Sequence, residues 1–135
     1  MVATVVVLPD TEWAGRADVL AGVTGGVDVQ GASATQMCAD LLRVQPESPL
    51  VVVAHGSACA VLPAIALAQR AAHRRVDAYV VVEPHAPAST DTWPDAPVLA
   101  VTNDDHTARL AALRGWTTTN DDAVTAILRV VDEMA

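Results

Sequence analysis

The sequence contains no lysine and no phenylalanine, and its 135 residues include only three tryptophans and one tyrosine. The chain has eight arginines and sixteen acidic residues, which gives a net charge of −8. A protein that binds nucleic acid needs cations to displace counterions from the phosphates, and an anionic membrane surface likewise attracts basic segments. The composition therefore argues against both partners, and we expect no nucleic acid and no membrane.

Long apolar runs are also missing. No apolar run reaches the roughly 18–20 residues of a membrane span, and no basic segment precedes the first apolar run, as a signal peptide would require. The two cysteines, Cys38 and Cys59, have neither metal-binding nor redox spacing. We therefore expect a cytoplasmic protein with two buried thiols and no cofactor.

What the sequence does contain is sufficient for a packed core. Hydrophobic residues make up 52% of the chain and charged residues 18%, and the length suits one domain covering residues 1–135. Most of the apolar residues are alanine and valine, so the core must be built from small and β-branched side chains.

Apolar runs and turn residues predict strands that alternate with helices. The predicted strands are 2–8, 27–30, 50–54, 78–82, 97–102 and, at an edge, 116–119. The predicted helices are 13–23, 34–44 with Ser33 as N-cap, 58–73 with Pro63 in its first turn, 106–114, and 121–134 with Val124, Ile127, Leu128 and Val131 facing inward. This order is typical of an α/β three-layer sandwich with a mostly parallel sheet of about five or six strands.

Ligands of such folds bind outside the carboxyl ends of the strands. The strand ends carry Pro9-Asp10, His55-Gly56-Ser57, Glu83-Pro84-His85 and, after the strand at 97–102, Asn103 to His106. Three of the four histidines lie in these positions, and the fourth, His73, is expected on the surface. Trp13 and Trp93 are predicted in loops on the same side, where either would line an apolar pocket.

Residues 51–58 resemble the strand, elbow and helix of the α/β-hydrolase superfamily, where the elbow reads G-H-S-x-G. Other segments resemble that family in the same order. Residues 5–8 with Trp13 resemble the strand and loop of the oxyanion hole, and residues 28–33 resemble a D-x-x-G-x-G-x-S turn. Residues 39–42 resemble the helix before the nucleophile strand. Residues 97–105 resemble the strand and turn of the triad acid, and residues 123–128 resemble the last helix. The resemblance covers nearly the whole chain and implies a minimal, capless α/β-hydrolase fold, similar to small serine hydrolases of the retinoblastoma-binding-protein type.

The sequence departs from that family at the catalytic positions. Ala54, Gly56 and Ala58 replace the first glycine, the nucleophilic serine and the last glycine, and Ser57 falls one position beyond the nucleophile. Residues 116–120, where the triad histidine is expected, contain none, while Asp104 or Asp105 stands at the position of the acid. Glycine adopts strained elbow angles at little cost, so we expect the turn to persist without its nucleophile.

These departures favour a degenerate, hydrolase-like pseudoenzyme that binds a small acyl or carbonyl ligand. Asp10, Trp13, His55 and Gly56 are the candidate ligand-binding residues, and oxyanion-hole amides including that of Ser57 would polarise the carbonyl. Asp104 or His106 would serve any proton transfer.

Two alternatives remain open. An active esterase or thioesterase would use Ser57, with His106 or His85 as base and Asp104 or Asp105 as acid. A metal-binding, chelatase-like protein would use His55, His85 and His106, with Glu83 or Asp104 as a further ligand. In each case the two strands missing from the family pattern leave a sheet edge exposed, which favours a homodimer.

Overall fold

The computed structural model describes residues 3–23, 25–85 and 93–134. Its centre is a six-stranded sheet in which every neighbouring pair is parallel, with the order β2-β1-β3-β4-β5-β6. The strands are β1 (Thr4–Val7), β2 (Gly26–Asp28), β3 (Leu50–His55), β4 (Ala78–Val82), β5 (Val98–Val101) and β6 (Thr117–Thr119). The α/β sandwich with a parallel sheet is therefore confirmed.

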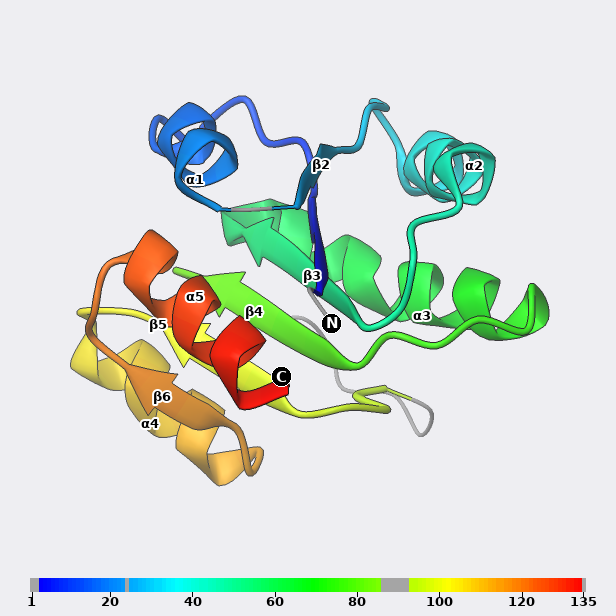
Figure 1. Ribbon diagram of the computed structural model, residues 1–135. Helices are drawn as coiled ribbons and strands as arrows, with labels where there is room; N and C mark the ends of the chain where they lie inside the picture. Colours follow the sequence, from blue (N-terminus) through cyan, green and yellow to red (C-terminus); the bar gives the residue numbers. More distant parts are fainter. Residues whose placement is uncertain (1–2, 24, 86–92, 135) are drawn as a thin grey trace.

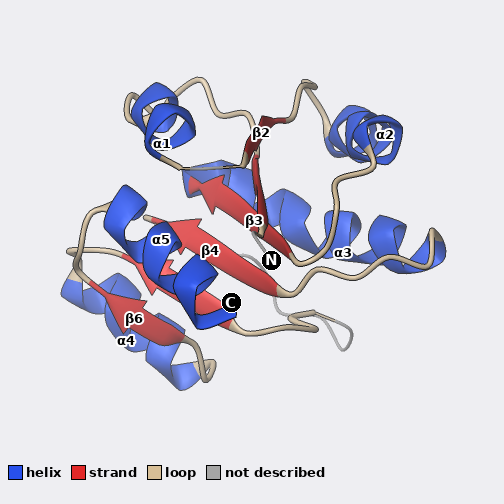
Figure 2. Ribbon diagram, viewed as in Figure 1, coloured by secondary structure: helices blue, strands red, loops and turns tan. Residues whose placement is uncertain are grey.

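Helices cover both faces of this sheet (Figure 2). The helices are α1 (Arg16–Gly22), α2 (Ala34–Val44), the 3₁₀ helix η1 (Gly56–Val61), α3 (Leu62–Ala71), α4 (Asp105–Leu113) and α5 (Ala123–Met134). One apolar cluster joins the sheet to α2, α3 and α4, and a second joins it to α1 and α5. The molecule thus has three layers with a core on each side of the sheet.

The central strands form because their side chains are apolar on both faces. Residues 50–54 of β3 and all of β4 are buried, as continuous valine-rich runs predict for strands covered by helices on both sides. Alternation sends Val52 into the core beneath α2 and α3, and Val51 and Val53 into the core beneath α1 and α5. By the same alternation, His55 points to the α1 and α5 face.

The strand order reverses once, at β1. The chain runs from β1 outward to β2, then returns across β1 to β3 and continues in the opposite direction to β6 (Figure 1). The switch point therefore lies between the carboxyl ends of β1 and β3, which is where open parallel sheets bind ligands. The loops that begin with Pro9-Asp10 and with His55-Gly56 meet at this position.

Several expectations about local structure are wrong. The segment predicted as one helix over 58–73 is divided into η1 and α3, although Pro63 does lie in the first turn of α3. Leu128 is 38% exposed, and Ala126 takes its place in the core. Cys38 is only half-buried, whereas Cys59 is fully buried. Trp93 lies in the core against Tyr79 and Trp116, away from the carboxyl ends of the strands.

None of the helices in the described ranges is both long and apolar enough to cross a bilayer.

The N-terminus of α2 offers a direct test of this local structure. The hydroxyl of Ser33 accepts a hydrogen bond of 3.2 Å from the backbone N–H of Gln36, and the Gln36 side chain accepts one of 2.6 Å from Ala32 N–H. Because the cap satisfies an otherwise unpaired donor, Ser33→Ala should lower the free energy of unfolding by about 1 kcal/mol, as measured by urea denaturation. Thr35→Ala, an exposed change in the same turn, should not destabilise the protein, and equal losses in the two variants would contradict the capping role.

Candidate functional site

A hydrogen-bonded acid and imidazole lie at the switch point. Asp10 follows β1, and His55 is the last residue of β3, the adjacent strand. Their side chains meet with His55 Nδ1 2.7 Å from Asp10 Oδ2. Both residues were candidate ligand-binding residues, but the sequence did not indicate that they pair.

The Asp10 carboxylate is held in its charged form. Its side chain is only 7% exposed, and burial, the largest single effect, raises the pKa of Asp10. The hydrogen bonds from His55 and from the Glu12 backbone N–H, together with the nearby imidazoles of His55 and His85, outweigh burial and lower the pKa below its ordinary value. An ionised carboxylate only accepts hydrogen bonds, so His55 donates through Nδ1.

Trp13 fixes the orientation of the imidazole. Its ring stacks on that of His55, with centroids 5.0 Å apart and planes inclined by 6°. The indole also packs against the core beneath α1 and α5. The His55 side chain is consequently only 19% exposed, and its ring is held by a hydrogen bond at the edge and a stacked ring on the face.

Gly56 follows directly and forms the apex of the turn between β3 and η1. Its φ of +55° lies in the left-handed region, where glycine is favoured. A Cβ added there would lie 3.5 Å from Asp10 Oδ2 and 4.0 Å from His85 Cε1. Gly56 is buried. Apart from its chain neighbours, no other heavy atom of the described residues lies within 4 Å of the added Cβ, so a methyl group there would be in ordinary van der Waals contact with an acid and an imidazole.

Two residues hold these loops in place: Arg16, which the sequence did not single out, and Glu83, which the sequence indicated only as a metal ligand. Arg16 donates to the carbonyls of Leu8 and Val7, each at 2.9 Å, and pairs with Asp28 at 2.5 Å. Its guanidinium therefore ties the end of β1, and with it the loop carrying Asp10, to the end of β2. An arginine at the start of a helix gives no sequence signal for this role, because its partners are backbone carbonyls.

Glu83, at the end of β4, has a similar role. It has a φ of +43°, which is uncommon for a residue other than glycine. Its carboxylate accepts hydrogen bonds from the Thr102 hydroxyl and from Asn103 N–H, at 2.9 and 3.1 Å. On the other side, the backbone N–H of His85 donates to the carbonyl of Gly56 at 3.2 Å. The segment 83–85 thus links the apex to the turn after β5.

The candidates after β5 form a separate group. Asp104 caps α4 by accepting from Thr107 N–H and its hydroxyl, and these bonds lower the pKa of Asp104. Asp104 and Asp105 line a cavity of about 420 Å³ at the ends of β5 and β6. His106 lines a different cavity, of about 220 Å³, with Pro84 and Trp116. The acids and the imidazole of this group therefore face different cavities.

Ser57 is exposed, and within the described residues no hydrogen bond joins its side chain to an imidazole. Cys59, two residues further on, is buried, and burial together with the nearby Asp10 charge raises its pKa to about 12. Neither side chain is thus held as an activated nucleophile. The structure brings together Asp10, Trp13, His55, Gly56 and His85, and it does not join them to Ser57 or His106.

In the described ranges, no three histidine, cysteine, aspartate or glutamate side chains gather in a way that would hold a metal ion. The expected convergence of His55, His85 and His106 as ligands is therefore wrong.

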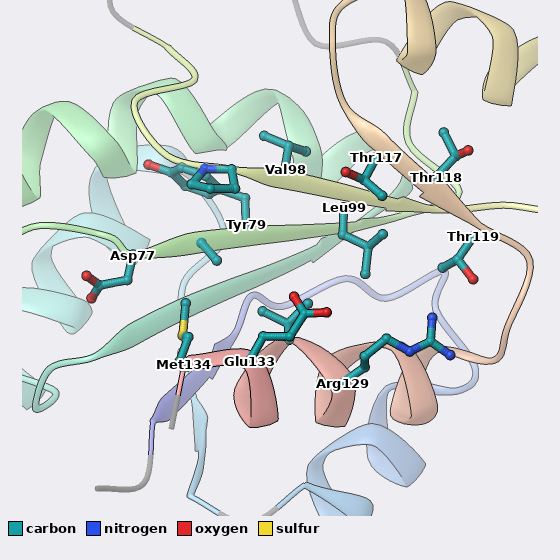
Figure 3. A pocket seen from close by; sticks show the side chains of 13 residues that line it. Asp77, Tyr79, Val98, Leu99, Thr117, Thr118, Thr119, Arg129, Glu133 and Met134 are labelled. Carbon is teal, nitrogen blue, oxygen red and sulfur yellow. The ribbon is translucent and has the colours of Figure 1, made fainter.

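A further cavity of about 400 Å³ lies between α5 and strands β4 to β6 (Figure 3). Leu99, Thr117 and Arg129 are among the side chains that line it, and Arg129 is paired with Asp121. Among the described residues, its lining includes no histidine, cysteine or serine. Its titratable lining residues are Asp77, Tyr79, Arg129 and Glu133.

Comparison of this chain with protein-family models, with curated proteins and with solved structures found no match.

The backbone conformation and surroundings of Gly56 predict how its substitution affects stability. Gly56→Ala should lower the free energy of unfolding by about 1–2 kcal/mol, because the left-handed backbone disfavours a Cβ, while the neighbouring atoms lie at ordinary contact distance. Gly115 has a φ of +79° with nothing within 4 Å of its added Cβ, so Gly115→Ala should cost a similar amount. A far larger loss for Gly56→Ala in urea denaturation would mean that the apex is filled.

The Asp10 carboxylate predicts a pH-dependent contribution to stability. Because folding lowers the pKa of Asp10, its contribution is full above the unfolded pKa and is lost as the pH falls below about 4. Asp10→Asn should therefore be less stable than wild type at pH 7, and this difference should shrink at pH 3. The exposed control Asp132→Asn should show no such convergence; a constant deficit for Asp10→Asn would contradict the assignment.

Proposed function

We propose that the protein is a degenerate α/β-hydrolase-like protein that binds a small acyl or carbonyl ligand above Gly56. The observation that carries this proposal is the apex of the turn at the switch point, where a glycine in the left-handed region stands at the family's nucleophile position. Its positive φ supports an elbow-like turn, and no nucleophilic side chain occupies the apex.

The arrangement of the other resembling segments supports the proposal. The elbow follows a buried central strand, the candidate acids follow β5, and the segment that resembles the family's last helix forms α5. The sheet is parallel throughout its described strands, as a minimal hydrolase-like fold requires. In this reading, the backbone N–H of Ser57 polarises the carbonyl oxygen of the ligand.

Electrostatics at the apex favour a neutral ligand. The ionised Asp10 carboxylate lies beside Gly56, and it disfavours an anionic ligand there because like charges repel. A small ester, thioester or amide satisfies this constraint.

A cytoplasmic location and a homodimer through one of the sheet edges stay predictions.

Binding is testable by NMR. Titrating ¹⁵N-labelled protein with the acetyl thioester of N-acetylcysteamine should shift the amide signals of Gly56 and Ser57 and the indole signal of Trp13. Gly56→Ala should weaken binding, because its methyl group enters the ligand's space, while Gly115→Ala should bind as wild type does. Shifts confined to the cavity lined by α5, or no shifts, would contradict the proposal.

Labelling with a fluorophosphonate probe distinguishes the active-esterase alternative from the proposed ligand-binding protein. We expect no label on Ser57, because no base is hydrogen-bonded to it in the described residues. Stoichiometric labelling that Ser57→Ala abolishes would establish the active esterase or thioesterase instead.

A further inference from the structure

The pair formed by Asp10 and His55 has the composition of a general base and its orienting acid. Since Asp10 is ionised and only accepts, Nδ1 of His55 carries a proton and Nε2 of the neutral ring carries a lone pair. Within the described residues, the hydrogen bond of the ring is made through Nδ1, and none engages Nε2. Nε2 is therefore the nitrogen that is available to accept a proton.

The pair is held rigidly. Asp10 Oδ1 accepts from Glu12 N–H at 2.9 Å while Oδ2 binds the imidazole, so both carboxylate oxygens are engaged. Trp13 stacks on the ring, and Arg16 ties down the end of β1. Catalytic groups whose orientation is fixed before the substrate binds lose less entropy in the reaction.

The pair also lies beside the apex at Gly56. The same oxygen, Oδ2, that binds His55 is 3.5 Å from the position of an added Cβ at Gly56. In a serine hydrolase this position carries the nucleophile. Here a glycine stands at this position, directly after His55 in the chain.

We propose that His55 is the general base of this site and that it activates a water molecule to attack the acyl carbon of a small ester or thioester. The inference rests on the proposed function, since it needs an acyl ligand above Gly56. It differs from the family mechanism in that no acyl-enzyme forms and the base lies before the elbow.

The proposed step balances with water as the only co-reactant. An O–H bond of water breaks, its proton moves to Nε2, and the oxygen forms a bond to the carbonyl carbon while the C=O π electrons move to the carbonyl oxygen. When the tetrahedral intermediate collapses, the C–O or C–S bond breaks and the leaving group takes the proton from Nε2. Asp10 acts as a positioning residue that also stabilises the transient imidazolium.

Hydrolysis of p-nitrophenyl acetate by the full chain tests the role of His55. General-base catalysis typically contributes 10²–10⁴-fold, so His55→Gln should lower the protein-dependent rate at least about 100-fold. The control His73→Asn, at an exposed position with a left-handed backbone that asparagine tolerates, should retain the wild-type rate. Retained activity in His55→Gln, or a loss in His73→Asn as large as that in His55→Gln, would overturn the proposal.

Two further readouts separate a base from a nucleophile and from a structural role. Mass spectrometry during turnover should detect no acetyl group on any histidine or on Ser57, and the rate should fall in D₂O, because proton transfer accompanies the attack. Asp10→Asn should lower kcat with little change in KM, since the Asp10 carboxylate acts through His55. An acetyl-histidine intermediate, or a change confined to KM, would contradict the mechanism.

Binding distinguishes failure of this inference from failure of the proposed function. His55→Gln should still show the amide shifts at Gly56 and Ser57 with the acetyl thioester of N-acetylcysteamine. Binding by wild type without turnover of either ester or thioester would overturn the role of His55 alone. The absence of binding would overturn both proposals.

Discussion

The hydrogen bond between Asp10 and His55 is the interaction on which the site depends. It joins the ends of two adjacent strands on either side of the switch point. Its geometry requires that β1 and β3 be neighbours, that Asp10 remain ionised, and that Trp13 keep the imidazole in place. A change in any of these conditions would disturb the surroundings of Gly56.

The scaffold provides this geometry through ordinary packing. Valine-rich strands are buried on both faces, so the register of β1 against β3 is fixed and the two strands end at the same edge. Arg16 and Glu83 then extend this order into the loops by binding backbone groups and a hydroxyl of neighbouring turns. The site is therefore built on rigid strand ends, with each loop tied to its neighbour.

The sequence predicted the features that depend on local pattern. Apolar runs located β3 and β4, and the N-cap at Ser33 and the proline in the first turn of α3 followed from residue type. The positive φ of Gly56 agrees with its residue type. In each case neighbouring residues alone carried the information.

Features that depend on the order of the strands were missed. The pairing of Asp10 with His55 spans 45 positions and became visible only once β1 was placed beside β3. His106 follows a strand end, as expected, but the first turn of α4 directs it to a cavity that Asp104 and Asp105 do not line. Leu128 fits the helical period of the core and nevertheless lies at its margin, because the position of α5 on the sheet decides which residues are covered.

The tautomer of His55 tests the central claim most directly. Long-range ¹H–¹⁵N NMR of the histidine rings distinguishes a proton on Nδ1 from one on Nε2. The account predicts that neutral His55 carries its proton on Nδ1, bound to Asp10, and that Asp10→Asn changes this state. A neutral ring protonated on Nε2 in the wild-type protein would contradict the account, because Nε2 would then have no lone pair with which to accept a proton.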